Sequence, residues 1–166
     1  MIILGIDPGT TTTGFGLIKE ENGRLKLKDY GVIKTKPNLP LARKLAEIYR
    51  DIKKLIKTIK PDIVAVEQIF FFKNTKTAMA VGQARGVILL AAERVKVTIA
   101  EFTPLQVKIA ICGNGRAKKS QVQDMAKIVL SLDKIPRPDD AADAIAIAVC
   151  CANNLKHQKA YQEGQK

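Results

Sequence analysis

Several residue types that other functions would need are scarce in this sequence of 166 residues. Histidine occurs once, at position 157 in a polar C-terminal stretch, so serine and threonine lack a histidine base nearby and a hydrolase triad is not expected. The three cysteines, Cys112 and the adjacent Cys150 and Cys151, do not make a disulfide framework. We expect them to pack as small apolar side chains in a cytoplasmic protein.

Long apolar runs and the loop of P-loop nucleotide-binding proteins are also missing. No apolar run approaches the roughly 18 residues of a membrane-spanning helix, so no membrane partner is expected. The absence of a GxxxxGK[ST] motif excludes a P-loop site. The composition, 46% hydrophobic and 27% charged, is that of a globular protein. We expect a single domain over residues 1–155 and a flexible tail over residues 156–166.

Positive charge is in clear excess. The 28 Lys and Arg against 16 Asp and Glu give a formal net charge of +12, which favours a polyanionic partner, nucleic acid first. Two stretches, residues 70–86 and 103–119, contain no acid and adjoin candidate motifs. Their basic residues are Lys73, Lys76, Arg85, Lys108, Arg116, Lys118 and Lys119. We expect such stretches to contact phosphates, the alternative being an ordinary solvated surface.

The hydrophobic pattern predicts an α/β fold that opens with three strands. The sequence Asn22-Gly23 is typical of a hairpin turn between the second and third strands. Alternation of strands and helices after that point indicates a partly parallel, mixed central sheet with helices on both faces. The predicted strands are 2–6, 15–19, 25–35, 62–66 and 96–101, and the predicted helices are 41–59, 75–94, 104–111, 118–132 and 139–154.

Four acids occupy positions that can converge. Asp7 and Glu67 each directly follow a predicted strand, and the carboxyl ends of neighbouring parallel strands meet at one edge of a sheet. Asp140 and Asp143 lie three residues apart in the first turn of the last helix, hence on one face. Oxygen-only ligands favour Mg²⁺, with Mn²⁺ as a substitute, and two such ions can hydrolyse a phosphodiester. The alternative is that these acids only form turns or cap a helix.

Three consecutive phenylalanines, Phe70, Phe71 and Phe72, precede the second helix. Three adjacent rings cannot all be buried on one face, so at least one is expected to be exposed. Beside a nuclease site an exposed ring can stack on an unpaired base. The alternative is that all three pack beneath the loop.

Small residues form a stripe along the predicted helix 75–94. Ala78, Gly82 and Gly86 fall at steps of four, and glycine inside a helix costs about 1 kcal/mol relative to alanine. A close neighbour is therefore expected. Packing on the sheet is the simpler interpretation, and contact with the same helix of a second subunit is the alternative.

The motif GIDPGTTTTGFG at residues 5–16 resembles the phosphate-binding turn of actin-like ATPases, although 166 residues leave no room for their second lobe. With the blocks EQIFFFKNTKTAMAVGQARG at 67–86, QVK at 106–108, GNGRAKKSQV at 113–122 and PDDAADAIAIA at 138–148, it more closely resembles the RuvC family of crossover junction endodeoxyribonucleases. These blocks span nearly the whole chain.

This resemblance implies a ribonuclease H-like fold, a homodimer, and Mg²⁺-dependent cleavage of opposed strands of a four-way Holliday junction in recombination and repair. It also implies the branch-migration proteins RuvA and RuvB as partners. Asp7, Glu67, Asp140 and Asp143 match the family's acids, with Asp139 a rival to Asp140. Phe70 matches an aromatic residue that wedges against a base, with Phe71 or Phe72 as rivals. Lys108 and Lys119 match residues near the scissile phosphate, and Lys73 and Lys118 are further expected DNA contacts.

Two other functions remain open from the residues alone. One is a non-catalytic, basic nucleic-acid-binding domain of the same fold, in which the acids have only structural roles. The other is an actin-like, phosphate-binding regulator. Cleavage of a labelled junction separates the first from a nuclease, and nucleotide titration separates the second.

Overall fold

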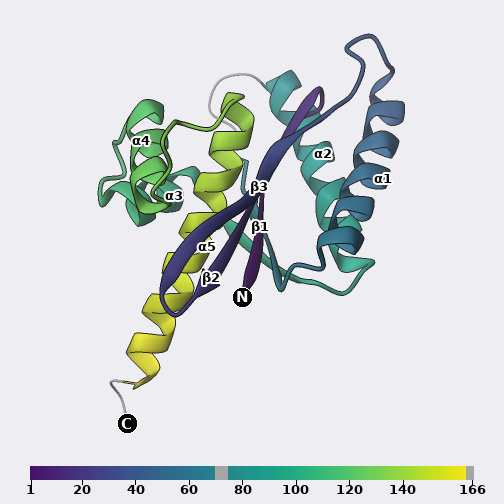
Figure 1. Ribbon diagram of the computed structural model, residues 1–166. Coiled ribbons are helices and arrows are strands. Elements are labelled where there is room, and N and C mark those ends of the chain that lie inside the picture. The colour runs from purple at the N-terminus through teal and green to yellow at the C-terminus, as the bar shows by residue number, and fades with distance from the viewer. Residues whose placement is uncertain (70–74, 164–166) are drawn as a thin grey trace.

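The computed structural model describes residues 1–69 and 75–163, and this part of the chain contains one mixed sheet of five strands (Figure 1). The strands are β1 (Ile2–Asp7), β2 (Thr12–Glu21), β3 (Arg24–Lys34), β4 (Ile63–Glu67) and β5 (Thr98–Phe102). Their order is β3-β2-β1-β4-β5. β1 and β2 pair antiparallel, as do β2 and β3, whereas β4 is parallel to both β1 and β5. The predicted mixed α/β sheet with three leading strands is confirmed.

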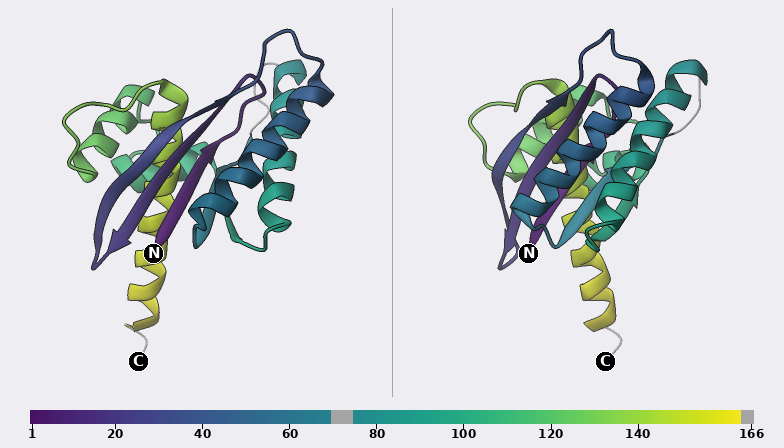
Figure 2. Two further views of the ribbon diagram at one scale, coloured as in Figure 1. Left: turned by 45° about the vertical axis from the view of Figure 1, so that its right-hand side comes forward. Right: turned by 90° about the vertical axis from the view of Figure 1, so that its right-hand side faces the viewer.

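Helices cover both faces of the sheet (Figure 2). One face carries α1 (Leu41–Ile59) and α2 (Thr75–Glu93), and the other carries α3 (Pro104–Cys112), α4 (Lys119–Val129) and α5 (Asp139–Glu163). The alternation of side chains along a strand explains the two layers. In β1, Ile3 packs in the core beneath α5, while Leu4 and Ile6 pack in the core beneath α1 and α2.

The hairpin turn is confirmed, and the strand before it is longer than predicted. Asn22 and Gly23 both have positive φ, 50° and 79°, as a two-residue turn of this type requires. β2 begins at Thr12 rather than at residue 15. The polar run looked like a loop, but Thr12 pairs with Lys34 and Gly14 pairs with Asp7. Partner strands, not local hydrophobicity, set this boundary.

The last helix is the buried centre of one layer and runs further than predicted. Its residues from Ala141 to Ala152 are buried with the exception of Asp143, and Cys150 and Cys151 pack there as expected. α5 continues to Glu163, so the predicted end near residue 154 was wrong. Residues 155–163 contain no proline or glycine, and extending a formed helix is far easier than starting one. No helix in the described ranges has the length and apolar character needed to cross a membrane.

The small-residue stripe of α2 does not pack on the sheet, which corrects the simpler interpretation. A Cβ atom built on Gly82 or Gly86 would meet no other heavy atom within 4 Å. Met79 and Leu90, on the same side of the helix, are 63% and 50% exposed. The buried side of α2 is instead formed by residues such as Ala84 and Ile88. The stripe therefore lies on an open, apolar surface.

Candidate active site

Strand pairing places Asp7 and Glu67 side by side. β1 and β4 are parallel with Ile6 opposite Val66, so the next residue of each strand is one of the two acids. Ile6 and Val66 point into the core beneath α1 and α2. Because side chains alternate, Asp7 and Glu67 point to the opposite face, toward α5. The register of the two parallel strands therefore places these acids side by side at the strands' carboxyl ends, as predicted.

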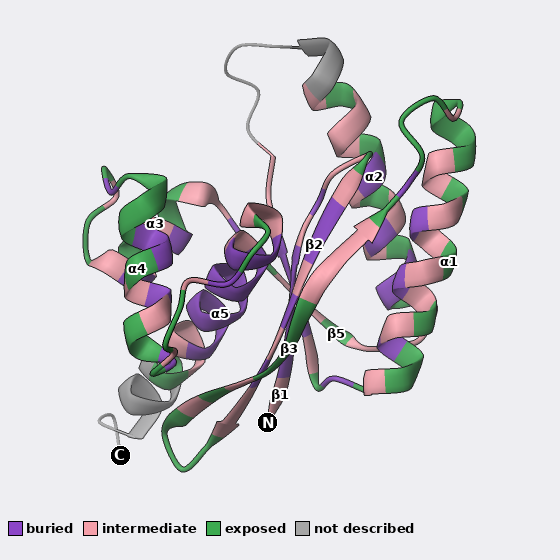
Figure 3. Ribbon diagram, turned by 45° about the horizontal axis from the view of Figure 1, so that its top comes forward, coloured by how far each residue is buried: buried purple, intermediate pink, exposed green. Residues whose placement is uncertain are grey.

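Three glycines allow the first turns of α5 to lie directly on the sheet (Figure 3). A Cβ on Gly5 would overlap the carbonyl oxygen of Ala144, and one on Gly14 would overlap the carbonyl oxygen of Asp140. At Gly16 a Cβ would lie 2.6 Å from Cγ1 of Ile145, well inside contact distance. Glycine is therefore required for this approach. The sequence analysis missed these residues, although alternate glycines within a strand are a signal of a close backbone neighbour.

The approach of α5 brings its acids to the strand ends. Burial raises the pKa of Asp7 from 3.8 to about 8, with further increases from Glu67, Asp143 and Asp140. Burial and then Asp143 raise the pKa of Glu67 from 4.5 to about 7. Such effects require short distances between the carboxyl groups. The structure thus places the four predicted acids near one another at this end of the sheet, each of them half-buried.

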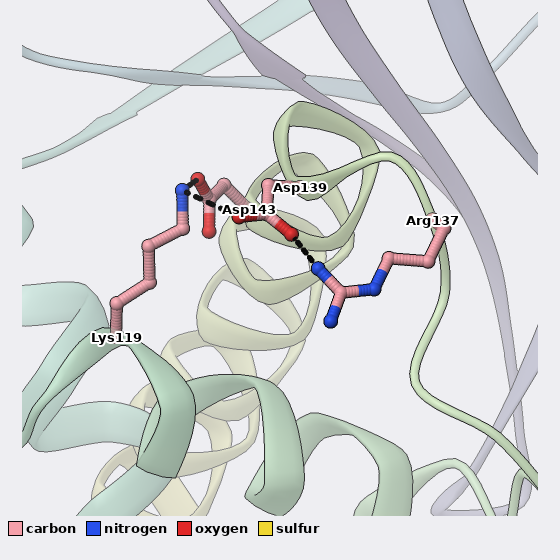
Figure 4. A network of polar contacts seen from close by, with 4 residues as sticks. All are labelled: Lys119, Arg137, Asp139 and Asp143. Atoms are coloured by element: carbon pink, nitrogen blue, oxygen red, sulfur yellow. Dashed lines mark hydrogen bonds and ion pairs between the residues drawn. The ribbon is translucent and has the colours of Figure 1, made fainter.

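Lys119 lies in this cluster from the first residue of α4 (Figure 4). Its Nζ is 2.6 Å from Oδ2 of Asp143 and 3.9 Å from Oδ2 of Asp139. Its positive charge lowers the pKa of both Asp7 and Glu67, opposing the effect of burial. Lys118, one residue earlier, is exposed and precedes the helix.

Asp139 and Asp140 differ in their surroundings. The Asp139 carboxylate accepts a hydrogen bond from Nη1 of Arg137, as Figure 4 shows, which the sequence analysis did not anticipate. Asp140 is among the groups that raise the pKa of Asp7, and Asp139 is not. These contacts support the preference for Asp140 as the member of the cluster, with Asp139 paired to cations at its edge.

A cavity of about 180 Å³ lies between the cluster and α3. Its polar lining consists of Glu67, Lys108, Lys119 and Asp143, and its apolar lining of Pro104, Val107, Val122 and Ala146. A capping box fixes the start of α3, because Thr103 Oγ1 accepts from the Gln106 backbone N–H and the Gln106 side chain accepts from the Thr103 N–H. This cap fixes the first turns of α3, and with them Lys108, which lines the cavity beside Glu67 and Asp143.

The donor set of the cluster suits a hard divalent cation. All its donors are carboxylate oxygens, and burial, followed by the charges of neighbouring acids, raises the pKa of two of them, Asp7 and Glu67. As the side chains are positioned in residues 1–69 and 75–163, no three acidic, histidine or cysteine groups converge tightly enough to enclose an ion, and Asp143 is paired with Lys119. The chemistry of the residues fits Mg²⁺ or Mn²⁺.

Some predicted DNA contacts lie outside the described residues. They are Phe70, with its rivals Phe71 and Phe72, and Lys73. Lys108, Lys118 and Lys119 are described, and two of them border the acids.

The strand order and two helical layers are those of the ribonuclease H-like class of α/β proteins, and half-buried carboxylates beside lysines are suited to phosphodiester hydrolysis. A family model for the crossover junction endodeoxyribonuclease RuvC matches residues 3–151. The chain belongs to the RuvC family of crossover junction endodeoxyribonucleases. Of the three functions left open by the residues, family membership supports the nuclease.

Individual relatives agree with this assignment. RuvC of Heliobacterium modesticaldum is 50% identical over 155 residues, covering 93% of this chain and 96% of the relative. RuvC of Syntrophomonas wolfei is 53% identical over 150 residues, covering 90% and 87%. A solved structure of Thermus thermophilus RuvC in complex with a Holliday junction substrate has a TM-score of 0.85 at 33% identity, covering 95% of this chain and 96% of that one.

Proposed function

We propose that this chain resolves four-way DNA junctions as a homodimer, each subunit cutting one of two opposed strands by Mg²⁺-dependent hydrolysis, in partnership with RuvA and RuvB in the cytoplasm. The observation that carries the proposal is the group of half-buried acids Asp7, Glu67, Asp140 and Asp143, in which burial and neighbouring carboxylates raise the pKa of Asp7 and Glu67, a cost that a bound cation would remove. Thermus thermophilus RuvC, which shares the fold, was solved with a Holliday junction substrate.

The residues of the cavity have separate tasks in this reaction. Lys108 and Lys119 line it with positive charge and are suited to hold a phosphate of the cleaved strand against the acids. Asp7 and Glu67, fixed on neighbouring strands, and Asp140 and Asp143, fixed on α5, would hold Mg²⁺ or a pair of such ions. When bound, the metal would activate a water molecule and stabilise the leaving oxygen. Val107 and Val122 form part of the apolar lining beside these acids.

The exposed stripe of α2 supports the homodimer. Met79 and Leu90 expose apolar surface on either side of Gly82 and Gly86, where no neighbouring atoms limit a close approach. Small residues flanked by large apolar ones allow two helices to pack closely. A dimer through α2 would also provide the two active sites that cutting two strands needs.

Cleavage of a labelled four-way junction tests the catalytic proposal. With Mg²⁺ the parent protein should cut two opposed strands, and with EDTA it should bind without cutting. Asp7→Asn should bind the junction with parental affinity and fail to cut, since only the metal-holding oxygen is lost. Asp139→Asn is the matched control, because that acid pairs with Arg137 instead, and it should cut at near the parental rate. Parental cutting by Asp7→Asn would disprove this site.

Sedimentation measurements test the dimer separately. Leu90→Asp, on the open face of α2, should shift the protein from dimer to monomer. Leu105→Asp is the control, since Leu105 is 56% exposed on α3 and lies on another surface. A dimer that persists in Leu90→Asp, or is lost equally in the control, would rule out this interface.

A further inference from the structure

A second cavity, of about 480 Å³, lies at the end of the sheet opposite the acids. It is bordered by the last turn of α1, the two residues that precede β4, the residues that follow α2, and the first residue of β5. Asp62 immediately precedes β4 and Glu67 ends it, which puts about 16 Å between this cavity and the acid cluster. Figure 1 shows α1 and α2 ending next to one another there, away from the first turn of α5. The proposed nuclease activity makes no use of this cavity.

The rim of the cavity is strongly basic. Its charged lining consists of Lys57, Lys60, Arg94 and Lys96, with Asp62 as the one acid. The Asp62 carboxylate is already occupied, since Oδ2 accepts the backbone N–H of Ile2 at 2.6 Å. Among residues 1–69 and 75–163, none of the four cations takes part in an ion pair.

The negative ends of the two helices offset only part of this positive charge. The carboxyl ends of α1 and α2 each carry about half a negative charge, which nearby lysines offset in many helices. Together with Asp62, these ends leave an excess of about two positive charges at the rim. An excess of that size in a concave site matches an anion with two negative charges.

Two of the cations stand where lysine is disfavoured. Lys60 and Lys96 have φ values of 51° and 57°, the left-handed conformation in which glycine is the usual residue. A side chain in that conformation costs roughly 1 kcal/mol relative to glycine. Both lysines line this one cavity, and unfavourable conformations of this kind concentrate at ligand sites. Half-buried Val95 and Val97 add apolar surface between them.

We propose that this cavity is a binding site for a phosphate-bearing ligand with a flat apolar part, which is the chemistry of a nucleotide. The four cations hold the phosphates, and the two valines contact the base. The volume falls within the range of small-molecule sites, roughly 300 to 1,000 Å³. Free nucleoside diphosphates and the phosphorylated end of a DNA strand share this chemistry.

Calorimetric titration with ADP tests the proposal, carried out in EDTA so that the acid cluster holds no metal. The parent protein should bind one ADP per chain, and Lys60→Gly with Lys96→Gly should bind about ten-fold more weakly or worse. Because glycine suits both backbone conformations, this variant should remain folded and cut junctions at the parental rate. Lys28→Gln with Lys134→Gln removes the same charge from exposed positions elsewhere and should bind as the parent does.

Further measurements keep the outcome decisive. If the glycine variant fails to fold, Lys57→Gln with Arg94→Gln replaces it, and the same loss of binding is expected. Pyrophosphate and a 5′-phosphorylated duplex are then tested as competitors of ADP. Displacement by pyrophosphate but not by the duplex indicates a free nucleotide as the ligand, and displacement by the duplex indicates a DNA end. Either result supports the site. No binding by the parent protein, or equal loss in the Lys28 and Lys134 control, would overturn the proposal.

Discussion

Replacing Asp7 with asparagine should stabilise the metal-free protein at neutral pH, although it removes a residue of the candidate active site. Burial, followed by the charges of Glu67 and Asp143, raises the pKa of the Asp7 carboxyl from 3.8 to about 8. The folded chain therefore keeps a proton on Asp7 over a pH range in which the unfolded chain has released it. Asparagine has no such proton and avoids this cost.

The magnitude follows from proton linkage. Below pH 4 the carboxyl is protonated in both states, so this effect is absent. Between about pH 4 and pH 8 the free energy of unfolding of the parent falls by about 1.4 kcal/mol for each pH unit. At pH 7 the free energy of unfolding of Asp7→Asn should exceed that of the parent by about 4 kcal/mol at most. This is an upper limit because Asp7 and Glu67 release their protons as a coupled pair. Above pH 8 the difference should level off.

Urea unfolding in EDTA, at several pH values from 5 to 9, measures this difference. Asp124→Asn, an exposed acid on α4, is the control and should show no such pH dependence. Adding Mg²⁺ should stabilise the parent more than Asp7→Asn, because the metal removes the repulsion only where all four acids are present. A difference between Asp7→Asn and the parent that does not grow with pH, or a variant less stable than the parent at pH 8, would refute the reasoning.

Three further predictions concern the surroundings of the acids. Gly14→Ala should lower the free energy of unfolding, measured in urea, by about 1 to 3 kcal/mol and should reduce cleavage, because the added methyl group overlaps the Asp140 carbonyl oxygen and displaces α5. Parental stability and cleavage in this variant would contradict the need for glycine beneath α5. Lys119→Gln should move the rising limb of the pH–rate profile to higher pH, since Lys119 lowers the pKa of both Asp7 and Glu67; Lys118→Gln should leave the profile in place, and an unmoved profile in both would contradict this role. Junction affinity should fall steeply with salt, and Lys108→Gln should reduce the slope of log affinity against log salt by about one; an unchanged slope would mean that Lys108 contacts no phosphate.

Local sequence signals predicted most of the fold. The apolar positions of residues 41–59 repeat with helical spacing, and α1 has those bounds. Asn22-Gly23 predicted the hairpin because few residue pairs adopt two consecutive positive φ angles. Boundaries that depend on partners were less accurate: β2 starts at Thr12 because its neighbours pair with it, and α5 continues to Glu163 because a packed helix extends easily.

By itself the sequence indicated which residues are candidates for the chemistry, since acids at the ends of strands and at a helix start are local features. Only the tertiary structure decided how closely they approach, because that distance depends on Gly5, Gly14 and Gly16 lying beneath α5 rather than on any spacing along the chain. It also reversed the interpretation of the α2 stripe, since a helix pattern does not specify whether its small residues face the sheet or the surface. Likewise, Lys60 and Lys96 lie 36 residues apart in the sequence, and they border one cavity because α1 and α2 end together.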